Sequence, residues 1–147
     1  MRARLDLRND DADLVRLTEF AGGFASRHKL ADEDSAPLQI ILDELFTNVV
    51  KYGYESAAGE GHPEGHIEVV LSLEADRLIV EFVDDGRPFD PLSSPPPDLD
   101  LPVEERPIGG VGIAIVRALV DEAEYRRDGN RNRLTLVRTV LRQPAMR

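Results

Sequence analysis

The chain has 147 residues, no cysteine, and 28 acidic against 18 basic side chains, which gives a net charge of −10 at neutral pH. This length fits one domain with a hydrophobic core of its own. The lack of cysteine excludes disulfides, thiolate metal sites and a cysteine nucleophile, and the acidic balance argues against a nucleic-acid partner. No apolar run approaches the roughly 20 residues that span a bilayer, so we expect a cytoplasmic protein without membrane contact.

The N-terminal third of the chain predicts one strand followed by two helices. Residues 3–7 alternate apolar and polar side chains, as strands do, and residues 9–11 carry side chains that cap helices. An apolar stripe at helical spacing then runs from Leu14 to Phe24. The second helix has its core face between Leu38 and Val49. Its capping candidates are Asp34 and Ser35, and Pro37 is expected in its first turn.

The middle of the chain predicts a β-hairpin and then a long loop. Residues 67–73 and 78–83 form two strands, and the four residues between them suit a tight turn. Six of the ten prolines lie between positions 91 and 107. Proline is excluded from helix interiors and central strands, so we expect an irregular loop there, of a type that often serves function.

The last third predicts one helix and a second pair of strands. Glycines at 109, 110 and 112 lead into an apolar helical face from Ile113 to Val120. Residues 122–125 and 134–137 then have strand patterns, joined by a turn at 128–130. The order strand, helix, helix, strand, strand, loop, helix, strand, strand predicts an α+β fold. We expect a two-layer sandwich with a mostly antiparallel sheet covered by helices.

Glu44 and Asn48 are the first candidate functional pair. They stand four residues apart on a predicted helix, at the edge of its core face, so they share one side of it. The simpler interpretation is two solvent-facing residues of an amphipathic helix. In the functional interpretation the amide oxygen of Asn48 ligates Mg²⁺, and Glu44 accepts a proton from a water or hydroxyl.

Asp84 and the glycines near position 110 supply two further candidates. Residues 83–86 end a strand and could form an ordinary turn. Alternatively, the Asp84 carboxylate accepts a hydrogen bond from an exocyclic amine such as that of adenine, and Gly86 lets the backbone approach the ring. The glycines at 109–112 precede a helix whose first N–H groups suit a phosphate, although a glycine-rich hinge fits equally well.

Together and in this order, the three stretches resemble the GHKL ATP-binding superfamily, which includes histidine kinases, gyrase B, Hsp90 and MutL. The matching boxes are DELFTN at 43–48, DDGRPF at 84–89 and GGVGI at 109–113. The segment 91–108 resembles the ATP lid of that superfamily, but it is acidic and lacks the usual lid glycines. The resemblance implies a sandwich of GHKL (Bergerat) type and a single domain over residues 1–147.

A narrower resemblance covers nearly the whole chain and is to the single-domain anti-sigma factor kinases of the RsbW and SpoIIAB type. It rests on residues 113–125 and the Gly129-Asn130 that follows. Members of that family phosphorylate a serine or threonine of a small STAS-domain anti-anti-sigma protein and also hold a sigma factor, so that partner exchange sets transcription. The resemblance therefore implies ATP and Mg²⁺ as cofactors, these two protein partners and a homodimer.

The resemblance also assigns roles to individual residues. Glu44 is expected as the general base, Asn48 as the Mg²⁺ ligand and Asp84 as the contact to the adenine amine. The other residues expected at the ATP site are Lys51, Gly86, Phe89, Arg106, Gly109, Gly110, Val111, Gly112 and Ile113.

Three functions stay open on the sequence. The first is a serine/threonine kinase that acts on a STAS-domain partner. The second is a binding module in which ATP only shapes the surface that holds a sigma factor or another regulator. The third is a stand-alone ATPase. The presence of Glu44 favours chemistry, because a pure nucleotide sensor needs no base.

Overall fold

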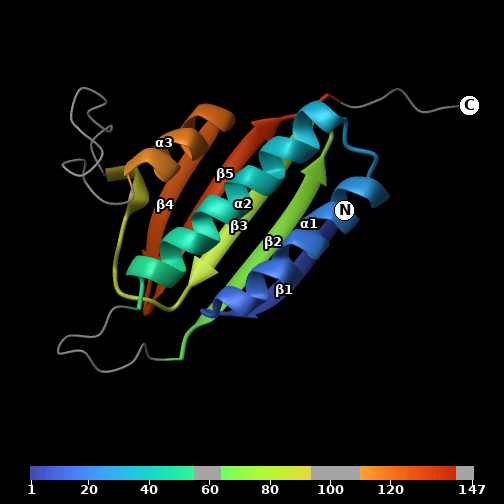
Figure 1. Ribbon diagram of the computed structural model, residues 1–147. Coiled ribbons are helices and arrows are strands. Elements are labelled where there is room, and N and C mark those ends of the chain that lie inside the picture. The colour runs from blue at the N-terminus through green and yellow to red at the C-terminus, as the bar shows by residue number, and fades with distance from the viewer. Residues whose placement is uncertain (55–63, 94–109, 142–147) are drawn as a thin grey trace, which may run out of the picture.

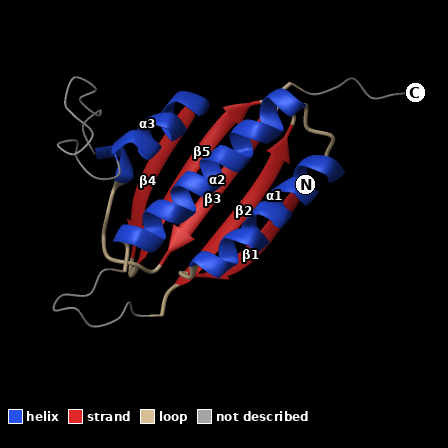
Figure 2. Cartoon of the chain, viewed as in Figure 1, coloured by secondary structure: helices blue, strands red, loops and turns tan. Residues whose placement is uncertain are grey.

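Strands with alternating burial form one layer of the fold, and helices with an apolar stripe form the other (Figures 1 and 2). The computed structural model describes residues 1–54, 64–93 and 110–141. The α+β, two-layer prediction is confirmed. The described strands are β1 (Arg2–Arg8), β2 (His66–Glu74), β3 (Arg77–Asp84), β4 (Glu122–Asp128) and β5 (Arg131–Thr139); the helices are α1 (Leu14–Arg27), α2 (Asp32–Tyr52) and α3 (Gly110–Leu119), with short 3-10 turns η1 (Asp11–Asp13) and η3 (Pro91–Ser93).

The sheet has the strand order β1-β2-β3-β5-β4, and each neighbouring pair is antiparallel. The two hairpins predicted from the sequence are present. Their turns contain left-handed residues, Ala75 at φ 54° and Gly129 at φ 57°, and glycine adopts this conformation without steric cost. This order places the end of β3 beside the start of β5, so that Asp84 and Asn132 face each other in the register.

Helix α2 lies across the middle of the sheet and supplies much of the core (Figure 1). Its buried positions recur every three or four residues, as an amphipathic helix requires. They pack with inward-facing side chains of the sheet such as Phe82 and Leu136. Full burial of each such apolar side chain contributes about 1.5–3 kcal/mol. The core residues of α2, each at most 2% exposed, are Leu38, Ile41, Leu42, Leu45 and Phe46.

The start of α2 differs from the prediction. Asp34 and Ser35 lie inside its first turn and do not cap it, because the helix begins at Asp32 and Ala31 is the residue at its cap. Pro37 is therefore the sixth helical residue and lies beyond the first turn. A proline there lacks the N–H that would bond to the carbonyl four residues earlier, which is that of Glu33.

The guanidinium of Arg138 on β5 compensates for this gap. Its Nη2 donates to the Glu33 carbonyl (3.2 Å), its Nε donates to the carboxylate of Asp34 (3.2 Å), and its Nη1 donates to the carbonyl of Leu119 (2.7 Å). Asp34 is only 2% exposed and also accepts from the N–H of Leu141 (2.8 Å). We call this group the Arg138 clamp, because it ties the start of α2 and the end of α3 to β5.

One sequence prediction falls largely outside the described residues. Of the proposed lid, residues 91–108, the structure describes only the 3-10 turn Pro91–Ser93. The single-domain assignment over residues 1–147 stays a prediction. Among the described helices, none combines the length and the hydropathy that a membrane crossing requires.

Candidate functional site

A pocket lies between the C-terminal half of α2 and the adjoining ends of β3 and β5. The space between its atoms is about 430 Å³, part of it open to solvent. Its walls are mostly apolar, with Asp84, Asn48 and Asn132 as the polar exceptions. The residues that line it are Leu45, Asn48, Val49, Gly53, Phe82, Asp84, Phe89, Pro91, Tyr125, Asn132 and Leu134.

Asp84 places a carboxylate at one end of this pocket. It is the last residue of β3 and is 5% exposed. Its Oδ1 accepts two hydrogen bonds, from the N–H of Gly86 and from Nδ2 of Asn132, both at 3.0 Å. Its Oδ2 accepts no hydrogen bond from the described residues. Every side-chain oxygen or nitrogen of the described residues that is fully buried has a hydrogen-bond partner, so an unpaired Oδ2 cannot be fully buried. The second oxygen is therefore open to the pocket.

Burial raises the pKa of the Asp84 carboxyl above its ordinary value. The hydrogen bonds from Asn132 and Gly86 oppose this shift, and the neighbouring Asp85 carboxylate adds to it. An acceptor of this kind is held in place but has lost part of its hydration. It gains most from a ligand that donates a hydrogen bond to Oδ2.

Asn132 is the main site residue that the sequence analysis missed. Besides the bond to Asp84, its Nδ2 donates to the carbonyl of Arg87 (2.8 Å). Its Oδ1 accepts from the hydroxyl of Tyr125 (2.6 Å), from the N–H of Phe89 (3.2 Å) and from Arg127 (3.1 Å). Both donors of the amide are engaged, so Asn132 holds the loop after β3 and orients Asp84.

A sequence signal for Asn132 did exist. Residues of one strand that share a parity point to the same face, and Leu134 and Leu136 are apolar. A single amide at an inward position of such a strand has to be paired. Its partners lie on β3, on β4 and in the loop after β3, so the signal shows that a polar group is buried there without showing what it binds.

The loop after β3 packs against the end of α2. The N–H of Arg87 donates to the carbonyl of Gly53 (2.9 Å). A Cβ on Gly86 would lie 2.6 Å from that carbonyl oxygen and 2.9 Å from Oδ1 of Asp84, both too close. Gly86 is thus required for the approach of two protein segments. Its predicted contact with a nucleotide ring stays a prediction.

Asp85 has a structural contact network, in contrast to its neighbour Asp84. Its Oδ1 accepts from the hydroxyl of Tyr54 (2.6 Å) and from the N–H of His66 (2.9 Å). Burial alone would raise the pKa of Asp85, but these hydrogen bonds outweigh it and hold the pKa below its usual value. Burial raises the pKa of Tyr54, which remains a neutral donor. The carboxylate therefore fastens the start of β2 to the end of α2.

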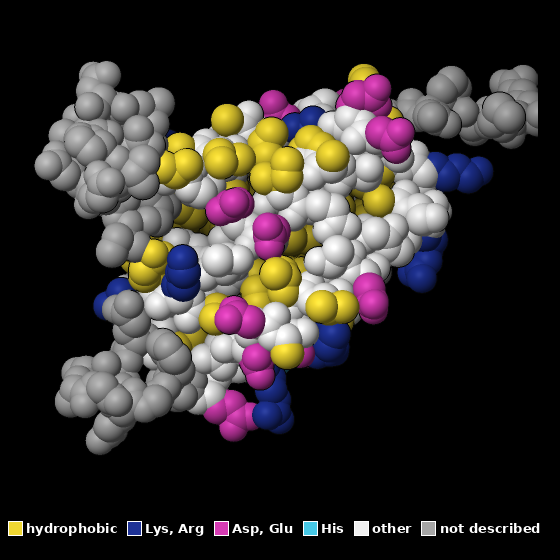
Figure 3. Space-filling model, viewed as in Figure 1, with side chains coloured by type: hydrophobic (Ala, Val, Ile, Leu, Met, Phe, Trp, Pro, Cys, Tyr) yellow, Lys and Arg dark blue, Asp and Glu magenta, His cyan; other side chains and the backbone are white. Residues whose placement is uncertain are grey.

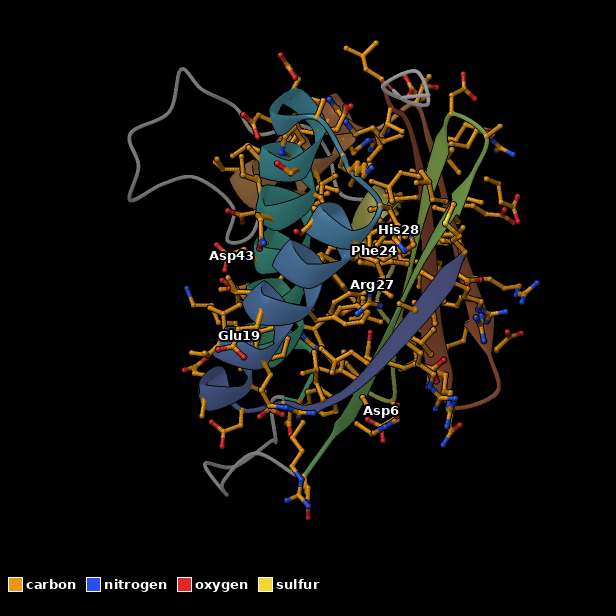
Figure 4. All side chains as sticks on the ribbon, turned by 90° about the vertical axis from the view of Figure 1, so that its right-hand side faces the viewer. Asp6, Glu19, Phe24, Arg27, His28 and Asp43 are labelled. Carbon is orange, nitrogen blue, oxygen red and sulfur yellow. The ribbon has the colours of Figure 1, made fainter. Side chains whose placement is uncertain are left out.

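Glu44 and Asn48 follow each other by one turn on α2, as predicted, and both are half-buried. Asn48 lines the pocket. Glu44 lies beside the first turn of α3, where a Cβ on Gly112 would overlap its Oε2. Asp43, the preceding residue, is exposed and points away from the sheet (Figure 4). Of the two adjacent acidic residues, Asp43 and Glu44, only Glu44 faces α3.

The remaining predicted residues are distributed unevenly. Phe89 lines the pocket, while Lys51 is exposed in the last turn of α2 and is not among the lining residues. On α3, Gly110 is the first residue, Val111 is 43% exposed and Ile113 is buried in the core. Apolar side chains gather on the surface over α3 (Figure 3). Arg106 and Gly109 lie outside the described residues. The role of each in nucleotide binding stays a prediction.

The described residues thus form an α+β sandwich whose mostly apolar pocket has a buried carboxylate at one end. The model of one protein family, described as the histidine kinase-like ATPase domain, matches residues 7–138. The chain therefore belongs to the histidine kinase-like ATPase domain family.

Within this family, the chain is similar to proteins named serine-protein kinase RsbW. The serine-protein kinase RsbW of Bacillus cereus is 33% identical over 119 residues, which are 78% of this chain and 69% of that protein. The serine-protein kinase RsbW of Bacillus mycoides is 32% identical over the same length, with the same coverage. These similarities confirm the resemblance to RsbW-type proteins of the GHKL superfamily.

A solved structure agrees with the fold. The crystal structure of the RsbU and RsbW domains of a Mycobacterium tuberculosis protein superposes with a TM-score of 0.64 at 17% identity. The superposition covers 95% of this chain and 32% of that longer chain. At 17% identity this structural similarity supports the two-layer architecture and assigns no role to individual residues.

Proposed function

We propose that this protein is an anti-sigma factor serine/threonine kinase. In this proposal it binds Mg-ATP, phosphorylates a STAS-domain anti-anti-sigma protein, and controls a sigma factor by partner switching, as a homodimer and as one domain over residues 1–147. The observation that carries the proposal is the open Oδ2 of Asp84 in an apolar pocket, in a chain of this family.

In this proposal the pocket takes the adenine end of a nucleotide. Leu45, Phe82 and Leu134 supply apolar walls suited to a planar ring. The only open side-chain carboxylate among the lining residues is that of Asp84, and it suits an exocyclic amine that donates a hydrogen bond. The amide donors of Asn132 are already engaged. Specificity for an amine at this position therefore rests on Asp84.

The phosphate end is formed by α2 and α3. Asn48 offers an amide oxygen, the kind of hard ligand that Mg²⁺ takes together with substrate phosphates. When bound, Mg-ATP supplies the phosphoryl group and the cation that neutralises its charge. The N–H groups of the first turn of α3 lack intrahelical partners and can donate to anionic oxygens.

Glu44 is the residue proposed to take the proton of the attacking hydroxyl. It stands one helical turn from Asn48, the proposed cation ligand. A carboxylate that orients or deprotonates the acceptor hydroxyl contributes about 10²–10⁴-fold to such a transfer. The acceptor would be a serine or threonine of the STAS-domain partner.

Replacement of Glu44 by glutamine tests this proposal. The substitution keeps the shape of the side chain and removes the base. We expect Glu44→Gln to bind ATP within about tenfold of the wild-type affinity, or roughly 1.4 kcal/mol. Transfer of labelled phosphate to a STAS-domain protein should fall about a hundredfold or more. The matched control is Asp43→Asn on the same helix, which should transfer at the wild-type rate because Asp43 is exposed.

The other outcomes are distinct. A wild-type protein that binds ATP and a sigma factor but labels no STAS-domain protein would establish the binding module instead. Hydrolysis of ATP without any protein acceptor would indicate a stand-alone ATPase. Wild-type transfer by Glu44→Gln would remove Glu44 from the mechanism and leave the kinase assignment intact.

A further inference from the structure

Gly112 lies where the first turn of α3 meets the side chain of Glu44 on α2. A Cβ at position 112 would overlap Oε2 of Glu44 and would lie 3.3 Å from its Cδ. Glu44 thus uses the space that any other residue at position 112 would fill. The helices start 78 residues apart, at Asp32 and Gly110, so only the tertiary fold brings these two positions together.

The two glycines of α1 lack this closeness to a neighbouring side chain. On α1, a Cβ at Gly23 would meet nothing within 4 Å, and one at Gly22 would make an ordinary contact of 3.7 Å with Gln39. Glycine in a helix destabilises it by about 1 kcal/mol relative to alanine. At position 112 the absence of a side chain leaves room for the Glu44 carboxylate, whereas at Gly23 no neighbour occupies the corresponding space.

The placement of Glu44 depends heavily on this contact. Its carboxylate makes no hydrogen bond and no ion pair with any other residue that the structure describes. Gly112 itself is held firmly, because the adjacent Ile113 and the residue one turn on, Val116, are buried in the core at 5% and 1% exposure. The first turn of α3 is therefore the fixed side of the contact, and the Glu44 side chain is the movable one.

We propose that Gly112 is a positioning residue for Glu44. Its missing side chain leaves the space in which the carboxylate rests, so the placement of α3 sets the placement of that carboxylate. A methyl group at 112 displaces the end of a flexible side chain and leaves the backbone in place. The functional consequence rests on the proposed role of Glu44 as base, whereas the contact itself does not.

The test is a carboxyl ¹³C NMR spectrum of the nucleotide-free full chain labelled at glutamate. The Glu44 resonance is assigned by its loss in Glu44→Gln. We expect Gly112→Ala to move this resonance while the melting temperature changes by no more than about 4 °C. The matched control Gly23→Ala adds the same methyl group to an open helical position and should leave the Glu44 resonance unmoved. A Glu44 resonance that is unchanged in Gly112→Ala overturns the proposal.

A transfer assay adds a second measurement. A displaced base lowers the rate of transfer by up to about a hundredfold, and Gly112→Ala should add no further loss to Glu44→Gln. If wild-type protein transfers no phosphate, the proposed function fails and the NMR result still decides this inference. Should Gly112→Ala fail to fold, Gly112→Ala in a Glu44→Ala background is the decisive variant. Folding of that double variant supports the contact, and failure to fold overturns it.

Discussion

The proposed role of Asp84 requires an ionised carboxylate, whereas its burial favours the protonated form. The carboxylate has to be ionised to accept a strong hydrogen bond, yet its burial raises its pKa. The folded protein therefore holds the proton more tightly than the unfolded chain does. As the pH rises from the ordinary carboxyl pKa of 3.8 through the raised value, the free energy of unfolding falls. The site thus carries a cost in stability at neutral pH.

Replacement of Asp84 by asparagine should remove that cost and also remove binding. The amide oxygen can still accept from Gly86 and Asn132, but an NH₂ group replaces the open Oδ2. We expect Asp84→Asn to be at least as stable as wild type at pH 7, with a difference that shrinks toward pH 3. Affinity for ATP should fall by about 1.5–3 kcal/mol, roughly 10–150-fold. Urea unfolding across pH and calorimetry with ATP measure the two effects.

Asn132→Ala, which removes the side chain that holds Asp84, is the matched control for Asp84→Asn. It removes five hydrogen bonds of the amide, to Asp84, Arg87, Phe89, Tyr125 and Arg127. It should lower stability by about 2–4 kcal/mol as well as weaken binding, because buried partners lose their bonds. An Asp84→Asn protein that is destabilised to the same extent would show that the negative charge stabilises this end of the sheet.

At the scale of elements, the Arg138 clamp determines how the two site-bearing helices are anchored. Helix α2 carries Glu44 and Asn48 in its second half, and α3 carries Gly112 in its first turn. The clamp lies at the opposite ends of both helices, where Arg138 bonds to the start of α2 and to the last residue of α3. The clamp thus anchors both helices at the ends that lie away from Glu44, Asn48 and Gly112.

We expect Arg138→Met to lower the free energy of unfolding by about 3–5 kcal/mol. It leaves the carboxylate of Asp34 buried without its cation, and it leaves the Glu33 carbonyl without the donor that compensates for Pro37. Arg138→Met combined with Asp34→Leu should recover part of the loss, since no unpaired charge is then buried. Urea denaturation measures both. A double variant that is no more stable than Arg138→Met would contradict this account of the clamp.

At the scale of the whole molecule, a nucleotide that binds only the folded state raises the melting temperature. At a hundred times the dissociation constant, Mg-ATP should add about 2.7 kcal/mol, or roughly 8 °C for a domain of this size. In Asn48→Ala the additional shift due to Mg²⁺ should disappear, because the pocket loses its proposed amide ligand. Differential scanning fluorimetry with ATP, with and without Mg²⁺, measures this.

Thr47→Ala serves as the control for that experiment, because Thr47 is the exposed neighbour of Asn48 on α2. It should keep the full Mg²⁺ effect. A wild-type protein whose melting temperature is unchanged by saturating Mg-ATP would refute the assignment of all three boxes together. An unaltered Mg²⁺ effect in Asn48→Ala would show that the cation is held by other groups.

The local pattern of the chain determined its elements and their order. Apolar periodicity is a property of ten or so neighbouring residues, so it located α1, α2, both hairpins and α3 without knowledge of the fold. Tight turns are equally local, as Gly129 shows. The places of Glu44 and Asn48 on the second half of α2 and of Asp84 at the end of β3 followed from the same periodicity, together with the family resemblance.

The tertiary structure alone decided which distant residues meet. Asn132 reaches Asp84 because β5 lies beside β3, and this pairing joins segments 48 residues apart. Arg138 meets Asp34 across 104 residues, which explains why a first-turn aspartate is buried and does not cap its helix. The family resemblance singled out Gly112 for nucleotide binding, but its contact with Glu44 arises only because α3 packs on α2. Such contacts depend on strand order and helix placement, which no local pattern of side chains encodes.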